Sequence, residues 1–331
     1  MRVIYNGCTD PFFNLAAEEI LLAEGQGDIF MIWRNEKSVI VGKNQNTYGE
    51  IDRDFCEKNG VKAVRRLTGG GAVFHDLGNV NFSFFTDCNA DSEMDFLPYI
   101  SEVTKVLSAF GIDAYKNGRN DIEADGYKIS GNAQCRYNCK DGRVRLLHHG
   151  TLLFSADMAS LAGALRPRAE KMESKGIKSV RARVKNIKDM EGYCGPADAE
   201  SFAEALCGMM AEGEVGTLTD RERALIKELS ENKYSRWEWN YGESPRFSDT
   251  VSRRFPFGTV EISYTAKKGI IEEIRISGDF FAKADISSLE EKLVGVSLED
   301  VFLKEALSDA EKYIHGATGG DIAELLLNNK E

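Results

Sequence analysis

The sequence is poor in the features that mark specialised classes of protein. Its 331 residues include only six prolines and four histidines, and no apolar run reaches the roughly 20 residues that a transmembrane helix needs. The first apolar stretch soon meets Asp10, Glu18 and Glu19 instead of continuing as the apolar segment of a signal peptide. We therefore expect no contact with a membrane and a location in the cytoplasm.

Cysteine is present, but its spacing predicts neither a disulfide framework nor a metal site. The seven cysteines are an odd number scattered along the chain, and none has C-x-x-C spacing, so a reducing compartment is favoured. Cys135 and Cys139 are separated by three residues, but no second pair of Cys or His completes a zinc site. We expect these thiols to act as small hydrophobic side chains.

Positive charge is also scarce, because 53 acidic residues outnumber 42 basic ones and give a formal net charge of -11. Binding to nucleic acid needs an excess of Lys and Arg on the contacting face, so we expect no nucleic-acid partner. Residues 166–188 differ, with nine basic side chains against two acidic ones. This basic segment is either a solvated face or a surface for an anionic substrate or an acidic partner.

Helices and strands alternate in the pattern of an α+β protein. Helices are predicted where apolar residues recur every three or four positions, the first capped by Asn14 and ended by Gly25. Another begins at the capping box Thr219-Asp220-Arg221-Glu222. Short strands are predicted at 29–33 and 38–41, a half-buried strand at 80–84, and a hairpin that turns at Asp141-Gly142.

The pattern then restarts near the C-terminus. Turn-forming residues follow Trp239, and after them come a hairpin, with strands at 259–265 and 270–277, and three helical segments. We therefore predict two domains, residues 1–245 and residues 246–331, of which the second is a small α+β domain.

The most informative motif is a glycine triplet between two predicted strands, in the stretch Arg65-Arg66-Leu67-Thr68-Gly69-Gly70-Gly71-Ala72-Val73-Phe74-His75-Asp76. Glycines let backbone N–H groups approach a ligand closely, and the arginines supply positive charge. The stretch lacks the Gly-Lys-Ser/Thr of a phosphate-binding loop, and Phe74 stands where the dinucleotide fingerprint needs its third glycine. It is therefore a loop for an anionic ligand or a tight structural turn.

A second motif surrounds Lys128, which lies in a strand-like run between Gly126 and Gly131. A lysine so placed can bridge two anionic groups that must meet, such as a carboxylate and an α-phosphate. The alternative is an exposed lysine in a hairpin. A third motif, His148-His149, has no carboxylate or Cys at a fixed spacing, so a structural role is favoured over a catalytic pair. The same holds for His75.

Together these stretches resemble, in order, the motifs of lipoate–protein ligases. The matching stretches are Arg65-Arg66-Leu67-Thr68-Gly69-Gly70-Gly71-Ala72-Val73-Phe74-His75-Asp76-Leu77-Gly78-Asn79, Asn117-Gly118-Arg119-Asn120-Asp121, Lys128-Ile129-Ser130-Gly131-Asn132-Ala133, His148-His149-Gly150-Thr151-Leu152-Leu153 and Lys175-Gly176-Ile177-Lys178-Ser179-Val180-Arg181-Ala182-Arg183-Val184-Lys185-Asn186. Residues 5–190 carry the close resemblance, and the C-terminal part looks like the accessory domain of the family.

The resemblance implies a class II synthetase or biotin ligase-like fold, with a mixed sheet and flanking helices. It also implies ATP-dependent, AMP-forming activation of lipoate to lipoyl-AMP, with Mg²⁺, and transfer of the lipoyl group to a lysine. The acceptors implied are apo lipoyl domains of 2-oxoacid dehydrogenase complexes and the glycine-cleavage H protein.

Site residues are implied in the same way, with Lys128 as the catalytic residue that contacts both lipoate and ATP. Adenylate contacts carry over to Arg66, Gly71, Ala72, Val73 and Phe74, with Asn120 and Asp121 near the phosphate and Asp121 as a Mg²⁺ ligand. Lipoate contacts carry over to Lys128, Gly70, Gly71, His75 and His149. Leu67 and Thr68 depart from the small polar residues that relatives often have.

Three rival functions stay open on the sequence. A cysteine-dependent octanoyl or lipoyl transferase of the same superfamily would need a thiolate near Lys128. The segment before Lys128 has no cysteine, and Cys135, which is close in sequence, follows that lysine. A biotin ligase would have a Gly-Arg-Gly-Arg-type loop, which is absent. The third rival is a non-catalytic protein that binds lipoyl domains. Pyrophosphate exchange driven by lipoate distinguishes all three from the ligase.

Overall fold

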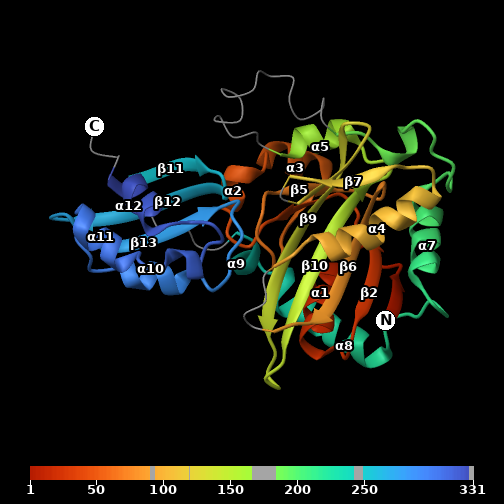
Figure 1. Ribbon diagram of the computed structural model, residues 1–331, viewed down its shortest axis with the longest axis horizontal. Coiled ribbons are helices and arrows are strands. Elements are labelled where there is room, and N and C mark those ends of the chain that lie inside the picture. The colour runs from red at the N-terminus through yellow and green to blue at the C-terminus, as the bar shows by residue number, and fades with distance from the viewer. Residues whose placement is uncertain (90–93, 119, 166–183, 242–248, 328–331) are drawn as a thin grey trace. The chain divides into compact units, whose positions relative to one another are not determined.

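The computed structural model describes residues 1–89, 94–118, 120–165, 184–241 and 249–327. They form two units (Figure 1). The first unit consists of Met1–Val41, Thr47–Arg66 and Val73–Asn240, and the second of Gly42–Asn46, Leu67–Ala72 and Tyr241–Glu331. The boundary predicted after residue 245, and most of the basic segment at 166–188, lie outside the described residues.

Seven strands of the first unit pair in one mixed sheet. Its first two strands are parallel, and every other neighbouring pair is antiparallel. The spatial order is β1 (Arg2–Asn6), β2 (Ile29–Arg34), β6 (Asn79–Asp87), β10 (Val144–Leu153), β9 (Tyr127–Asn138), β8 (Asp121–Ala124) and β7 (Ala114–Asn117). The predicted mixed sheet is therefore confirmed, including the hairpin of β9 and β10.

A small second sheet in the same unit carries part of the glycine-rich stretch. Its central strand β3 (Ser38–Val41) pairs in parallel with β4 (Lys62–Arg65) and antiparallel with β5 (Val73–His75). Arg66 therefore directly follows β4, and His75 ends β5.

Helices cover both faces of the seven-stranded sheet. On one face lies α1 (Pro11–Glu24), whose Glu18 accepts a hydrogen bond from Ser83. On the other lie α4 (Leu97–Ala109) and α7 (Ala199–Met210), with Tyr99 of α4 stacked on His148. Asn81 and Ser83 are accordingly buried. The prediction of a half-buried strand at 80–84 is wrong, because helices pack against both of its faces.

The start of α1 also differs from the sequence prediction. Its N-cap is Asp10, whose side chain accepts a hydrogen bond from Phe12 N, and Pro11 occupies the first turn. Asn14 is instead fully buried, where its side-chain amide donates to Asn35 Oδ1 at 2.9 Å. Proline at the first helical position explains the earlier start, because it needs no hydrogen-bond partner there.

The remaining helices of the first unit are short. The capping box at Thr219 and Glu222 is confirmed at the start of α8 (Asp220–Leu229). The others are α2 (Thr47–Glu50), α3 (Arg53–Asn59), α5 (Met158–Ala164), η1 (Ile187–Asp189), η2 (Ser230–Tyr234) and α9 (Trp237–Asn240). Within the described ranges, no helix combines the length and the apolar character that crossing a membrane demands.

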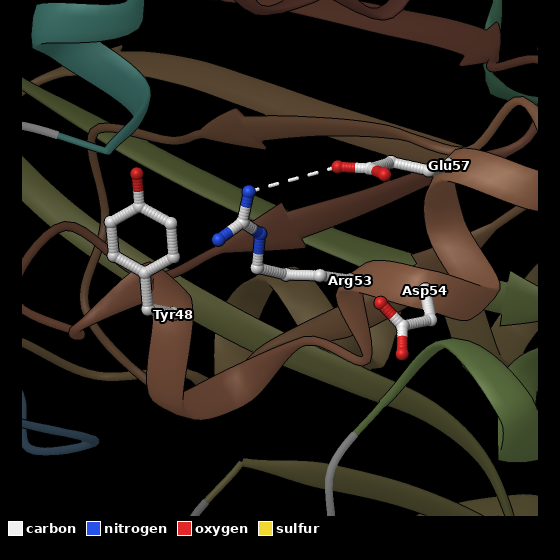
Figure 2. Close-up of a pocket in the computed structure, with 4 residues that line it drawn as sticks. All are labelled: Tyr48, Arg53, Asp54 and Glu57. Carbon is white, nitrogen blue, oxygen red and sulfur yellow. Dashed lines mark ion pairs between the residues drawn. The ribbon is translucent and has the colours of Figure 1, made fainter.

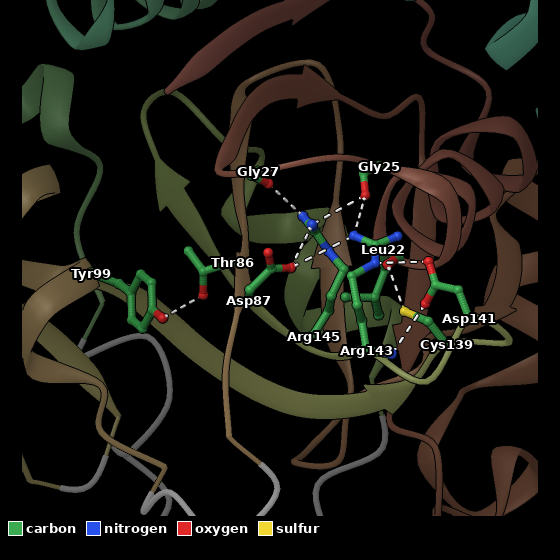
Figure 3. A network of polar contacts seen from close by, with 10 residues as sticks. All are labelled: Leu22, Gly25, Gly27, Thr86, Asp87, Tyr99, Cys139, Asp141, Arg143 and Arg145. Carbon is green, nitrogen blue, oxygen red and sulfur yellow. Dashed lines mark hydrogen bonds and ion pairs between the residues drawn. The ribbon is translucent and has the colours of Figure 1, made fainter.

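A buried arginine fixes the loop between α1 and β2 (Figure 3). Arg145 on β10 has no exposed surface. It donates to the carbonyl oxygens of Gly25 at 3.1 Å and Gly27 at 2.8 Å, and to Asp87 Oδ1 at 2.9 Å. Arg143 donates to the same Gly25 oxygen at 2.9 Å. Because charged hydrogen bonds of a buried group are costly to break, this cluster holds the C-terminal end of α1 against the sheet.

The second unit is a small α+β arrangement around its own apolar core. Its antiparallel sheet has the order β11 (Asp249–Phe255), β12 (Gly258–Lys267) and β13 (Ile270–Gly278). The helices are α10 (Ser287–Leu293), α11 (Asp300–Ala306), η3 (Ala310–Lys312) and α12 (Gly319–Leu327). The predicted hairpin and helical segments are confirmed, whereas β11 was not predicted.

Candidate active site

Lys128 and Asp121 form an ion pair at the junction of β8 and β9. The Lys128 Nζ atom lies 2.7 Å from Asp121 Oδ1, and about a third of each side chain is exposed. A Cβ atom at position 131 would lie 3.3 Å from this Nζ atom, so glycine leaves the room that the ammonium uses. The structure thus brings together two of the predicted site residues and leaves their charges accessible to a ligand.

Asn120 precedes this pair, but its side-chain amide faces the protein. Its Nδ2 atom donates to the Asn132 carbonyl oxygen at 2.6 Å, and its own carbonyl oxygen accepts from Asn132 N and Nδ2 at 2.9 and 3.0 Å. These three hydrogen bonds hold Asn120 against β9. Its amide therefore contacts the backbone in this structure, and a contact with phosphate stays a prediction.

Arg66 is a buried cation, 5% exposed, whose guanidinium donates to the Ile40 carbonyl oxygen at 3.0 Å. Burial lowers the pKa of Arg66 to about 10, the nearby Glu18 carboxylate opposes this decrease, and Arg65 adds to it. A pKa of about 10 still leaves the side chain charged at neutral pH. Arg66 therefore supplies fixed positive charge next to β5.

Glu18 is the acceptor at the centre of a buried hydrogen-bond chain. Trp33 Nε1 donates to the Ser83 hydroxyl at 2.9 Å, and this hydroxyl donates to Glu18 Oε1 at 2.6 Å. His149 Nδ1 lies 2.8 Å from the same oxygen. Among the described residues, the second carboxylate oxygen of Glu18 has no hydrogen-bond partner. A buried carboxylate oxygen without a hydrogen-bond partner is costly, so this oxygen is a candidate contact for a ligand.

His75 lies beside this chain, with its ring centroid 6.0 Å from that of Trp33. Asn35 Nδ2 donates to His75 Nδ1 at 3.1 Å, which places the ring proton on Nε2. That Nε2 atom is buried and has no partner among the residues of the described ranges. Burial, Arg66 and His149 lower the pKa of His75 to about 3, so the ring is neutral and offers one N–H donor.

The glycine triplet divides into three different roles. In the second unit, a Cβ at Gly69 would lie 2.5 Å from the Phe280 carbonyl oxygen, so this glycine allows a close backbone approach. Gly70 has a φ of +90° and donates to the same oxygen. At Gly71, no atom of the described residues lies within 4 Å of the Cβ position. Gly69 and Gly70 are therefore required by the backbone of the second unit.

The residues of the glycine-rich stretch that are predicted to contact adenylate or lipoate fall in both units. Gly70, Gly71 and Ala72 belong to the second unit, whereas Arg66, Val73, Phe74 and His75 belong to the first. Phe74 is buried, and Gly71, Ala72 and Val73 are half-buried.

His148 lies on the opposite face of the sheet from His149 and is fully buried. Burial and the neighbouring His149 lower the pKa of His148 well below its usual value. Its two ring nitrogens face Gln134 at 2.9 Å and Asn132 at 3.3 Å. The two histidines of the motif therefore have different surroundings, and His148 is enclosed by protein.

A separate surface hollow contains none of these residues (Figure 2). Tyr48 of α2 and Arg53, Asp54 and Glu57 of α3 line it, with Arg53 Nη2 3.7 Å from Glu57 Oε1. Both charged side chains of this pair are more than half exposed, and exposed pairs contribute little free energy. Nothing in this hollow forms a catalytic arrangement.

Two family models match the chain. The lipoyl protein ligase A/B catalytic domain matches residues 10–211, and the bacterial lipoate protein ligase C-terminus matches residues 244–326. The lipoate-protein ligase LplJ of Bacillus subtilis is 38% identical over 327 residues, which cover 96% of this chain and 97% of the relative.

Two solved structures share the fold of the larger part of the chain. A bi-partite lipoate protein ligase from Thermoplasma acidophilum, described with its E2 lipoyl domain, is 29% identical with a TM-score of 0.63, covering 75% of this chain and 100% of that chain. A lipoate-protein ligase A bound with ATP is 28% identical with a TM-score of 0.60, covering 73% of this chain and 98% of that chain.

These matches define a ligase that has a catalytic domain and a C-terminal domain. The chain belongs to the lipoate–protein ligase family. The resemblance found in the sequence is thereby confirmed, and the protein is an enzyme of the ligase class.

Proposed function

We propose that this ligase activates lipoate with ATP to lipoyl-AMP and then transfers the lipoyl group to a specific lysine of an acceptor protein. The observation that carries the proposal is the Lys128–Asp121 pair beside Gly131, an accessible cation next to a carboxylate in a chain of this family. The ligase of known structure with bound ATP supports the nucleotide as the second substrate.

In the first step, a lipoate carboxylate oxygen attacks the α-phosphorus of ATP. A new P–O bond forms, the bond from the α-phosphorus to the bridging oxygen breaks, and pyrophosphate leaves with the electron pair. Lys128 stabilises the negative charge that the carboxylate and the α-phosphate bring together, because an ammonium aimed at both groups is most favourable when they meet.

Asp121 fits a Mg²⁺ ion that arrives with the nucleotide. Its carboxylate is a third exposed, and Mg²⁺ usually takes one or two carboxylates together with phosphates and water. Across the described residues, no three His, Cys, Asp or Glu side chains gather as a metal site, which matches an ion held mainly by its nucleotide. When bound, the ion would neutralise phosphate charge.

For lipoate we propose the buried wall around His75 and His149, together with Lys128, Gly70 and Gly71. The neutral His75 ring and the Trp33 indole are the aromatic groups of this wall, and the His75 Nε2–H, which has no partner among the described residues, would limit the orientation of a bound group.

For the adenylate we propose Arg66, Asn120, Asp121 and Lys128 with residues 71–74, of which Gly71, Ala72 and Val73 are half-buried. The buried charge of Arg66 suits a phosphate. Asn120 is the weakest of these proposals, because its side-chain amide already donates to Asn132.

In the second step, the acceptor lysine amine attacks the lipoyl carbonyl carbon, the bond to AMP breaks, and the amine proton is lost to solvent. We propose apo lipoyl domains of 2-oxoacid dehydrogenase complexes and the glycine-cleavage H protein as acceptors. The archaeal ligase that is described with its E2 lipoyl domain supports this class of partner. The odd number and scattered spacing of the seven cysteines support a cytoplasmic location.

The match of residues 244–326 to a ligase C-terminus disfavours the cysteine-dependent transferase and the non-catalytic binding protein. Exchange of labelled pyrophosphate into ATP, driven by lipoate, tests the first step, and the mass increase of a lipoyl domain tests the second. Exchange that does not depend on lipoate would contradict the proposed function.

A further inference from the structure

The ring of His148 is held in an aromatic cage on the face of the sheet that α4 covers. Tyr99 stacks on it at 4.7 Å between ring centroids, and Phe82, Phe84 and Phe96 surround it at 5.6 to 6.1 Å. The side chain is fully buried. Protein side chains therefore enclose the ring, and its polar contacts are the two hydrogen bonds to Gln134 and Asn132.

Those hydrogen bonds fix one tautomer of the ring. Gln134 Nε2 also donates to the Asp95 carbonyl oxygen at 2.7 Å, so its amide nitrogen faces this region and donates to His148 Nδ1 at 2.9 Å. The ring proton is then on Nε2, which lies 3.3 Å from Asn132 Oδ1. His148 is thus a neutral donor to Asn132.

The donor from His148 fixes the orientation of the Asn132 amide. With its oxygen toward His148, Asn132 directs its Nδ2 atom to the Asn120 carbonyl oxygen at 3.0 Å and to the Ser130 hydroxyl at 3.3 Å. A flipped amide would place two N–H donors against each other at His148 and two acceptors against each other at Asn120.

A glycine makes this arrangement possible. Asn132 pairs with Gly150 in the register of β9 and β10, and a Cβ at position 150 would lie 2.4 Å from Asn132 Oδ1. The His148-His149-Gly150 motif therefore both orients the Asn132 amide and leaves space for it. Asn120, which Asn132 holds, is followed directly by Asp121.

We propose that His148 is a positioning residue for the Lys128–Asp121 pair. It acts by orienting the Asn132 amide, which holds Asn120 and so places the Asp121 carboxylate beside Lys128. The proposal rests on the proposed function, because it gives the pair its role in the adenylation step. It also assigns separate tasks to the two histidines of one motif, since His149 lies on the other face with Glu18.

Two matched substitutions separate the two hydrogen bonds of the ring. In His148→Gln, the side-chain nitrogen can take the place of Nε2 and keep the contact with Asn132. In His148→Asn, the shorter amide can take the place of Nδ1, near Gln134, but cannot reach Asn132. Tyr99→Phe, which keeps the stacked ring and loses only its contact with Thr86 at 2.9 Å, controls for disturbance of the cage.

The measurement is the kcat and the KM for lipoate in pyrophosphate exchange, with the melting temperature of each variant. We expect His148→Asn to lower kcat by about 10- to 100-fold, because a misplacement of about 1 Å has effects of that order, while the KM for lipoate changes by less than about 2-fold. His148→Gln should recover most of the kcat, and Tyr99→Phe should stay near wild type.

If both His148 variants lose kcat in proportion to their loss of folded protein, His148 is merely structural and the inference is wrong. If the wild-type enzyme is active and a folded His148→Asn variant has the same kcat, the inference is also wrong. A wild-type enzyme without lipoate-dependent exchange would instead overturn the proposed function, and the inference with it.

Discussion

The Nδ1 atom of His149 lies 2.8 Å from Oε1 of Glu18, a carboxylate without exposed surface. Ser83 donates to the same oxygen, and Glu18 favours the charged form of Arg66. One acidic side chain from α1 thus connects two strands of the main sheet with the cation that follows β4. This relationship makes Glu18 a candidate site residue, one that the sequence motifs do not contain.

Glu18→Gln should therefore weaken lipoate binding. The amide keeps the shape of the side chain but removes the negative charge that supports the charged form of Arg66, and its oxygen is a weaker acceptor for Ser83 and His149. We expect the KM for lipoate to rise by about 10-fold, the equivalent of one lost hydrogen bond to a charged group, as measured by pyrophosphate exchange. The matched control is Glu19→Gln, which changes the neighbouring carboxylate that accepts a hydrogen bond from the Tyr234 hydroxyl. An unchanged KM for lipoate in Glu18→Gln would exclude this role.

The pKa of His75 predicts a dependence of stability on pH. The folded-state pKa is about 3, below the ordinary value of 6.5, so the unfolded state binds a proton that the folded state does not. The free energy of unfolding should therefore fall as the pH decreases from 6.5 toward 3, by about 1.4 kcal/mol per unit for this group.

His75→Gln should flatten that dependence. Between pH 8 and pH 5 the variant should lose about 2 kcal/mol less than the wild type, measured by urea unfolding at each pH. Each protein is compared with its own free energy of unfolding at pH 8, where the histidine is neutral in the folded and the unfolded states. This comparison removes the pH-independent cost of the substitution. Parallel profiles for the two proteins would mean that His75 does not titrate as its burial requires.

Cys135→Ala should leave ligation within about 2-fold of wild type, because the adenylate route forms no covalent bond to the enzyme. Lipoylation of an acceptor domain, followed by mass spectrometry, measures this. Cys207→Ala, at a fully buried thiol whose pKa burial raises to about 12, controls for the loss of a sulfur atom. Complete loss of activity in a folded Cys135→Ala would favour the transferase.

Removal of the chain after residue 244 should leave a folded first unit that makes lipoyl-AMP poorly but transfers lipoyl from supplied lipoyl-AMP. The segments 42–46 and 67–72 lose their partners in such a fragment, since Gly278 N donates to the Asn44 oxygen and Gly70 N to the Phe280 oxygen. Circular dichroism and the two half-reactions measure the outcome. A fragment with full ATP-driven activity would contradict the expectation.

Much of the fold could be predicted from the sequence, because it depends on interactions between residues that are close in the chain. The capping box at Thr219, the turn at Asp141-Gly142 and the alternation of β12 and β13 all depend on neighbours within a few residues. The burial of Asn81 and Ser83 could not be predicted, because it depends on helices that are distant in sequence and cover both faces of β6.

The site shows the same limit. The glycine neighbours of Lys128 indicated an accessible side chain, which the structure shows, but the burial of Glu18 could not be recognised, since a single acidic residue in a helix is usually solvated. A weak signal exists in its spacing, because Asn14, Glu18 and Leu21 lie on one buried face of α1. The different roles of Gly69, Gly70 and Gly71 could not be predicted, because they depend on the backbone of Phe280, which is more than 200 residues away in the sequence.

The central claim is that Lys128 carries the adenylation step, and lipoate-dependent pyrophosphate exchange by Lys128→Ala tests it most directly. The ammonium lies 2.7 Å from Asp121 and near the surface, so its removal should leave the melting temperature almost unchanged. We predict a loss of at least about 100-fold in exchange, the order seen when a preorganised charge is removed. Lys116→Ala, in the edge strand β7 of the same sheet, should exchange at the wild-type rate. Exchange by a folded Lys128→Ala at a rate near wild type would contradict the account.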